Sequence, residues 1–158
     1  MNNALTKTVF GNKLKQQMTL EEAISFLTIK GLLNEGELAE KAISKKSGIA
    51  QCTPGTPAID LINGIQIKHA RSHFLKNNSR LQKAYISIKG TKAPICAVVT
   101  ESVTNQQYFL YIPYKDRKHL TGNTISICFD EYGCRGSSQW WLNDVGSFEN
   151  LCKLAKNA

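Results

Sequence analysis

The sequence predicts a single α/β domain in which a mixed central β-sheet is flanked by helices. Helix-type patterns fill the first third of the chain, alternating strand-type segments fill residues 58–129, and an amphipathic helix closes the chain. The 158 residues are 42% hydrophobic and 20% charged, which suits one folded domain. We therefore expect residues 1–158 to form one domain.

The N-terminal third contains two predicted helices. Residues 1–17 are polar and basic, and we expect them to form a flexible arm. A capping box of Thr19 and Glu22 begins the first helix, and Gly31 ends it. The second helix begins at Asn34 with Glu37 in the capping-box position, and it stops near Gly48.

The remainder of the chain is predicted to be rich in strands. Alternating or continuous apolar segments predict strands over 58–62, 65–71, 94–101, 107–113 and 124–129. The segment "SHFLKNNSRLQKAYIS", residues 72–87, fits either a helix or a basic loop that runs into another strand. The last segment, "SFENLCKLAK", predicts an amphipathic helix capped by Ser147.

Charge and cysteine content narrow the class of protein. Twenty Lys and Arg against twelve Asp and Glu give a net charge of +8, which favours a polyanionic partner. The five cysteines form no CxxC pair, a pattern typical of reduced thiols in a cytoplasmic protein rather than a disulfide framework or zinc site. No apolar run is as long as a membrane span, so we expect no membrane partner.

The stretch "AIDLINGIQIKHARS", residues 58–72, contains a hairpin signal at Asn63-Gly64. A two-residue loop would pair Asp60 with Ile67. A three-residue loop, residues 62–64 with Gly64 in the left-handed conformation, would instead pair Asp60 with Gln66. We favour the second register, because it places Asp60, Gln66 and Lys68 on one polar face. A half-buried hairpin whose polar face meets only solvent remains the alternative.

The polar face of this hairpin has the donors of a magnesium site. The Asp60 carboxylate, the Gln66 side-chain oxygen and the backbone carbonyl of Ile67 are oxygen ligands of the kind that Mg²⁺ prefers. Lys68 could hold or help to deprotonate a metal-bound water that faces a phosphodiester.

The order of these residues resembles the PD-(D/E)XK nuclease superfamily. A helix carrying Gly36 and Glu40 is followed by an acid at a strand end, a turn and Gln66-Ile67-Lys68, so the resemblance covers residues 36–70. It implies that Asp60 is the motif aspartate, that Gln66 stands in the D/E position and that Lys68 is the catalytic lysine. Glu40 would be the helix glutamate at the metal or its water, with Glu37 as its rival. The implied cofactor is Mg²⁺, with Mn²⁺ as a substitute.

Two positions depart from the family's pattern. Ile59 stands where the motif has proline, which is often absent in this superfamily. Gln66 stands where the motif has an acid, and a neutral amide removes one negative charge from the metal site. We therefore expect weaker Mg²⁺ binding unless Glu40 compensates.

Basic residues after the hairpin and on a later loop are candidates for contacts to DNA phosphates or base edges. They are His69, Arg71, His73, Lys76, Arg80, Lys83, Lys115, Arg117 and Lys118. A solvated basic segment is the alternative reading of both groups.

The sequence thus predicts a Mg²⁺-dependent DNA endonuclease, sequence-specific and either restriction-like or a homing endonuclease, which acts as a homodimer to cut both strands. A repair or recombination nuclease such as a junction resolvase is the next choice. Two non-catalytic alternatives are an inactive nuclease fold and a helix-turn-helix protein with residues 35–47 as the recognition helix. Against the helix-turn-helix reading, Glu35, Glu37 and Glu40 on that helix would repel phosphates. Metal-dependent cleavage would separate an enzyme from both non-catalytic alternatives.

Overall fold

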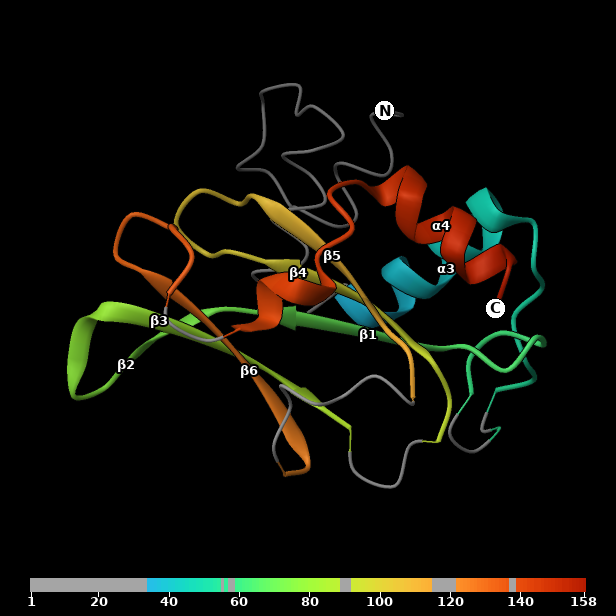
Figure 1. Cartoon of the computed structure of the whole chain (residues 1–158), viewed down its shortest axis with the longest axis horizontal. Helices are drawn as coiled ribbons and strands as arrows, with labels where there is room; N and C mark the ends of the chain where they lie inside the picture. Colours follow the sequence, from blue (N-terminus) through green and yellow to red (C-terminus); the bar gives the residue numbers. More distant parts are fainter. Residues whose placement is uncertain (1–33, 55, 57–58, 89–91, 115–121, 137–138) are drawn as a thin grey trace, which may run out of the picture. The chain divides into compact units, whose positions relative to one another are not determined.

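Figure 1 shows the computed structural model of the chain, which describes residues 34–54, 56, 59–88, 92–114, 122–136 and 139–158. The predicted basic arm, the first predicted helix and the candidate DNA contacts Lys115, Arg117 and Lys118 lie outside these described residues. Residues 36–158 form one compact unit.

In the described residues one α-helix precedes six consecutive strands, and a 3-10 helix and a second α-helix follow them. These elements are α3 (Glu35–Ser47), β1 (Gln66–Arg71), β2 (His73–Leu75), β3 (Asn78–Ser87), β4 (Ile95–Thr100), β5 (Gln107–Ile112), β6 (Thr124–Asp130), the 3-10 helix η2 (Gln139–Asn143) and α4 (Phe148–Lys156).

Both described helices begin and end where their caps predict. α3 starts directly after Asn34 and ends before Gly48, whose φ is +77° and whose N–H donates to the Ser44 carbonyl at 2.9 Å. α4 follows Ser147, whose side chain accepts a hydrogen bond from the Asn150 N–H. The helices predicted from Asn34 and Ser147 are therefore confirmed.

The strands form two three-stranded sheets. In the order β1-β4-β5, β1 pairs parallel with β4 and β4 pairs antiparallel with β5, so the predicted mixed sheet is confirmed. The second sheet, β2-β3-β6, is antiparallel throughout. Residues 72–87 form the short strand β2, a turn and β3, so the helical reading of this segment is wrong.

The mixed sheet is the central layer, because all six residues of β4 are buried. Cys96 and Val98 of β4 belong to a core cluster shared with Ile43 of α3 and Leu151 of α4. The alternate β4 residues, Ile95 among them, belong to a second cluster that contains the inward side chains of β3 and β6. Helices therefore cover one face of the mixed sheet, and the second sheet covers the other. The α/β class is as predicted, but the expectation of one central sheet flanked by helices is wrong, because the strands divide into two sheets.

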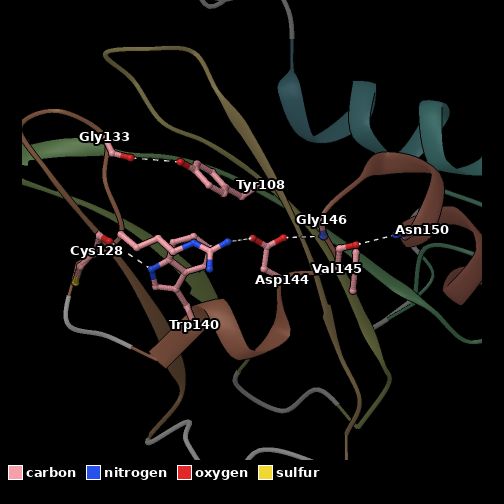
Figure 2. Close-up of polar contacts among 9 residues, drawn as sticks. Tyr108, Cys128, Gly133, Trp140, Asp144, Val145, Gly146 and Asn150 are labelled. Atoms are coloured by element: carbon pink, nitrogen blue, oxygen red, sulfur yellow. Dashed lines mark hydrogen bonds and ion pairs between the residues drawn. The ribbon is translucent and has the colours of Figure 1, made fainter.

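The connection through η2 links the second sheet to α4. Trp140 is 1% exposed, and its indole Nε1–H donates to the Cys128 carbonyl on β6 at 3.3 Å (Figure 2). The Arg135 guanidinium lies 5.5 Å from the Trp140 ring and pairs with the Asp144 carboxylate at 2.7 Å. Asp144 also accepts from the Gly146 N–H at 2.9 Å, just before α4 begins. This chain of contacts makes Trp140 a packing anchor near the last helix.

All five cysteines are free thiols, and Cys96 and Cys152 share the core beneath the helices. Burial, with a further contribution from the neighbouring Cys152, raises the pKa of Cys96 to about 12.

Among the described residues, no helix combines the length and apolar character that a membrane crossing requires.

Candidate active site

The turn before β1 adopts the three-residue loop that we favoured. The Leu61 N–H donates to the Ile65 carbonyl at 3.1 Å, and the Gly64 N–H donates to the Leu61 carbonyl at 2.9 Å. Gly64 has a φ of +89°, the left-handed conformation that such a loop requires at its last position. Leu61 and Ile65 therefore close the loop, as the favoured register predicts.

Beyond this closing pair the predicted strand 58–62 is wrong, because within residues 59–62 only Leu61 forms a bridge, to Gln51. The Asp60 N–H donates to the same Ile65 carbonyl at 2.8 Å. The next N–H along β1, that of Ile67, donates to the Asp60 side chain, at 2.6 Å from its Oδ2. A side-chain oxygen thus replaces the backbone carbonyl of a continuing strand, and the ladder ends.

The Asp60 carboxylate consequently lies beside the backbone of β1, not on the sheet face where the simple hairpin placed it. The Gln66 N–H points toward β4 and donates to the Pro94 carbonyl at 2.9 Å. Backbone groups alternate in direction along a strand, so the N–H and C=O of Ile67 both point away from β4. The predicted backbone ligand therefore shares the outer edge of β1 with Asp60.

Glu40 lies near this edge from α3. It is half-buried, and the Gln51 side-chain amide approaches its Oε2 at 3.4 Å. Burial raises the pKa of Glu40, and the negative charges of Asp60 and Glu37 raise it further, while Lys68 and the Gln51 hydrogen bond lower it. Glu40, Asp60 and Lys68 are thus close enough to act on one another electrostatically.

The side chains of Gln66 and Lys68 extend from the face of β1 opposite that of Ile67. They stand opposite Ile95 and Ala97 of β4, which belong to the core cluster on the second-sheet side. Gln66 is only 9% exposed, whereas Lys68 is half-buried. Asp60 and the Ile67 backbone therefore lie at the outer edge of β1 with Glu40 nearby. Gln66 and Lys68 extend from the face toward the second sheet, and Lys68 is close enough to lower the pKa of Glu40.

Residues 50–52 were not predicted to take part in this site. The Cys52 N–H donates to the Asp60 carbonyl at 2.8 Å, and the Ile62 N–H donates to the Ala50 carbonyl at 3.1 Å. This short pairing holds Asp60 from the side opposite β1 and brings Gln51 to Glu40. An isolated bridge has no hydrophobic period, so no sequence signal pointed to it.

The predicted DNA contacts within the described residues do not lie on one face. His69 shares its sheet face with Ile67, toward the helices, and its Nε2 lies 3.2 Å from Thr100 Oγ1. Arg71 is exposed and donates to Asn105 Oδ1 at 3.1 Å. The others lie on the β2-β3 hairpin: His73, Lys76 and Arg80 are exposed, and Lys83 is half-buried.

The donor set fits a hard divalent cation in part. The negative charge of Asp60 contributes to the raised pKa of Glu40, and a cation between the two carboxylates would relieve that repulsion. The Ile67 carbonyl adds a neutral oxygen. Across the described part of the chain, no group of three or more His, Cys, Asp and Glu side chains has the arrangement of a metal site. A complete ligand set here therefore needs the Ile67 carbonyl, the Gln66 amide or water.

No protein-family model matches the chain, and no curated protein matches it significantly.

Proposed function

We propose that this protein is a Mg²⁺-dependent DNA endonuclease with a PD-(D/E)XK-type site and a restriction-endonuclease-like core. The observation that supports the proposal best is that Glu40 lies within electrostatic reach of both Asp60 and Lys68, while the Asp60 carboxylate accepts from the Ile67 N–H. Two carboxylates can hold a metal ion that assists hydrolysis of a phosphodiester, and a nearby ammonium group can offset the charge of the phosphate.

Each residue of this group has a distinct role in the proposal. Asp60, Glu40 and the Ile67 carbonyl would hold Mg²⁺, with Gln66 as a neutral fourth donor. The bound ion would lower the pKa of a water and polarise the phosphate. The Lys68 ammonium orients the attacking water and offsets negative charge that develops on the phosphate oxygens.

The distribution of charge supports a nucleic acid substrate. Residues 61–100 contain seven Lys and Arg and no Asp or Glu, so this segment alone contributes +7 of the net +8. These forty residues include β1 and the β2-β3 hairpin. A basic segment beside an acidic metal site attracts a polyanion and leaves the carboxylates for the metal. Sequence specificity and a homodimer that cuts both strands belong to the same proposal.

Incubation of the full chain with supercoiled plasmid tests the function directly. We expect nicked or linear products with Mg²⁺ or Mn²⁺ and none with EDTA. A four-way junction assayed beside the plasmid separates a resolvase, which would cut only the junction, from a restriction-like enzyme. If neither DNA is cut with either metal, while the protein still binds DNA, the endonuclease proposal is wrong and a non-catalytic DNA-binding protein takes its place.

A further inference from the structure

The second sheet has a polar face that the proposed nuclease site does not use. Gln82, Ala84 and Ile86 of β3 are buried, so the alternate residues Lys83, Tyr85 and Ser87 point away from the mixed sheet. The register places their neighbours on β2 and β6 on the same side. We call this surface the outer face, and we define it by His73, Lys83, Tyr85, Ser87, Thr124 and Ser126. Cys128, which stands opposite Lys83 on the same side, is buried, and its carbonyl accepts from the Gly136 N–H at 2.8 Å.

Two aromatic rings lie next to each other on the outer face. The Tyr85 side chain is 47% exposed although it lies in the longest strand of the sheet. The ring of the exposed His73 lies 5.8 Å from the Tyr85 ring, at an interplanar angle of 42°. Exposed rings on a sheet offer flat apolar surfaces, and unpaired nucleic acid bases stack on such surfaces.

The charge and hydroxyl groups of the outer face suit a phosphate backbone. Lys83 stands directly opposite His73, and among the six residues of the face there is no carboxylate. Ser126 and Thr124 stand opposite Tyr85 and Ser87, which adds hydroxyl donors next to the aromatic rings. The nearest carboxylate on this side of β6, Asp130, is opposite Leu81, and its Oδ1 accepts from the N–H groups of the turn that follows.

We propose that the outer face binds single-stranded DNA, with bases stacked on Tyr85 and His73 and a phosphate at Lys83. A base-paired duplex hides the faces of its bases, so this surface would take an unpaired strand rather than the duplex substrate of the nuclease site. The choice of DNA over RNA rests on the proposed function, in which a strand opened beside the cut would be held here.

The test measures the affinity of the full chain for a fluorescein-labelled oligothymidine strand by anisotropy, in EDTA so that cleavage is excluded. We expect Tyr85→Ala to weaken binding about tenfold or more, and Tyr85→Phe to retain most of the affinity because the stacking surface remains. Lys83→Ala should weaken binding and reduce its salt dependence. Tyr132→Ala is the matched control, because Tyr132 is 74% exposed but lies in the turn after β6.

Three results would overturn this inference: unchanged affinity in Tyr85→Ala, an equal loss in Tyr132→Ala, or tighter binding of the RNA strand of the same sequence. The nuclease proposal is tested separately, because cleavage and single-strand binding depend on different residues. Lys68→Ala should abolish cleavage and leave binding of the single strand unchanged, whereas Tyr85→Ala should still cut duplex DNA. A wild-type protein that binds the single strand but cuts no DNA would contradict the nuclease proposal alone, and one that cuts DNA but does not bind the single strand would contradict this inference alone.

Discussion

Two glutamates of this protein, Glu101 and Glu40, lie in environments that shift their pKa values in opposite directions. Glu101 follows β4 and is fully buried, yet its carboxylate accepts from the Val103 N–H at 2.8 Å and the Thr104 N–H at 2.6 Å. The Thr104 hydroxyl donates to it at 2.5 Å. Burial alone would raise the pKa of Glu101, but hydrogen bonds from Thr104, Val103 and Gln82 outweigh burial, and the pKa is lowered.

Glu40 is more exposed than Glu101 and less well satisfied. The Gln51 side-chain amide donates to Glu40 at a long 3.4 Å, and Asp60 lies near Glu40 with the same sign of charge. Its pKa is raised, in contrast to that of Glu101. The difference separates two uses of a carboxylate: Glu101 is saturated with donors and fixes the turn between β4 and β5, whereas Glu40 has oxygen atoms that a cation could stabilise.

The largest expected effect is on cleavage, through the lysine beside Glu40. Lys68→Ala removes the ammonium group next to the attacking water, and we expect a loss of rate on the order of a thousandfold. Plasmid cleavage under single-turnover conditions measures it. Lys153→Ala is the control, because Lys153 is an exposed lysine of α4 that pairs with the exposed Glu149 at 3.2 Å. Cleavage by Lys68→Ala at the wild-type rate would contradict the assignment of the site.

The next effect is on stability, through Glu101. Glu101→Gln places an amide N–H₂ among N–H donors that need an acceptor, so we expect the free energy of unfolding to fall by about 3 kcal/mol. Urea denaturation measures the change, with the exposed Glu149→Gln as control. If Glu101→Gln and Glu149→Gln have the same midpoint, the hydrogen bonds to Glu101 do not stabilise the fold.

The same pair of carboxylates predicts opposite pH dependences. Because folding lowers the pKa of Glu101 below its ordinary value of 4.5, its contribution to stability is present above that value and is lost as pH falls through the folded-state pKa. Urea midpoints for the wild type and Glu101→Gln should therefore converge at acidic pH. Curves that stay parallel down to acidic pH would contradict a lowered pKa.

A smaller effect is expected at Gln66, which stands where the PD-(D/E)XK pattern of the proposed site has an acid. Gln66→Glu adds a charge near Asp60, and we expect cleavage to reach half its maximal rate at roughly tenfold lower Mg²⁺. Because Gln66 is only 9% exposed, burying the new carboxylate away from water costs free energy, so the free energy of unfolding without metal should decrease. Identical Mg²⁺ titrations of the wild type and Gln66→Glu would show that position 66 is not a ligand.

The smallest effect is expected at Glu40, on the stability of the protein in the absence of metal. Because folding raises the pKa of Glu40, its favourable contribution is present below the unfolded-state pKa and is lost as pH rises through the folded-state value. Glu40→Gln removes the repulsion with Asp60, so at neutral pH we expect a gain of about half a kcal/mol without metal. Thermal unfolding with and without Mg²⁺ measures it, and added Mg²⁺ should stabilise the wild type more than the variant. Equal stabilisation of both would exclude Glu40 from the metal site.

Local sequence signals determined much of this protein. The caps at Asn34 and Ser147, the glycine after α3 and the loop ended by Gly64 all act within a few residues, and each lies where the sequence predicts. The strands of the mixed sheet follow from apolar runs for the same reason. The charge pattern likewise needs no coordinates, since it is carried by the chain itself.

Tertiary structure alone decided how these pieces combine. The parallel pairing of β1 with β4 and the second sheet join segments far apart in sequence, which no local period encodes. Asp60 was expected in a strand, but its side chain competes with the backbone for the Ile67 N–H and ends the ladder. Gln51 reaches Glu40 only because residues 50–52 pair with 60–62. The sequence by itself named the charged residues of the site, while long-range packing set their positions, because side-chain hydrogen bonds and burial between distant segments have no signature in a single local pattern.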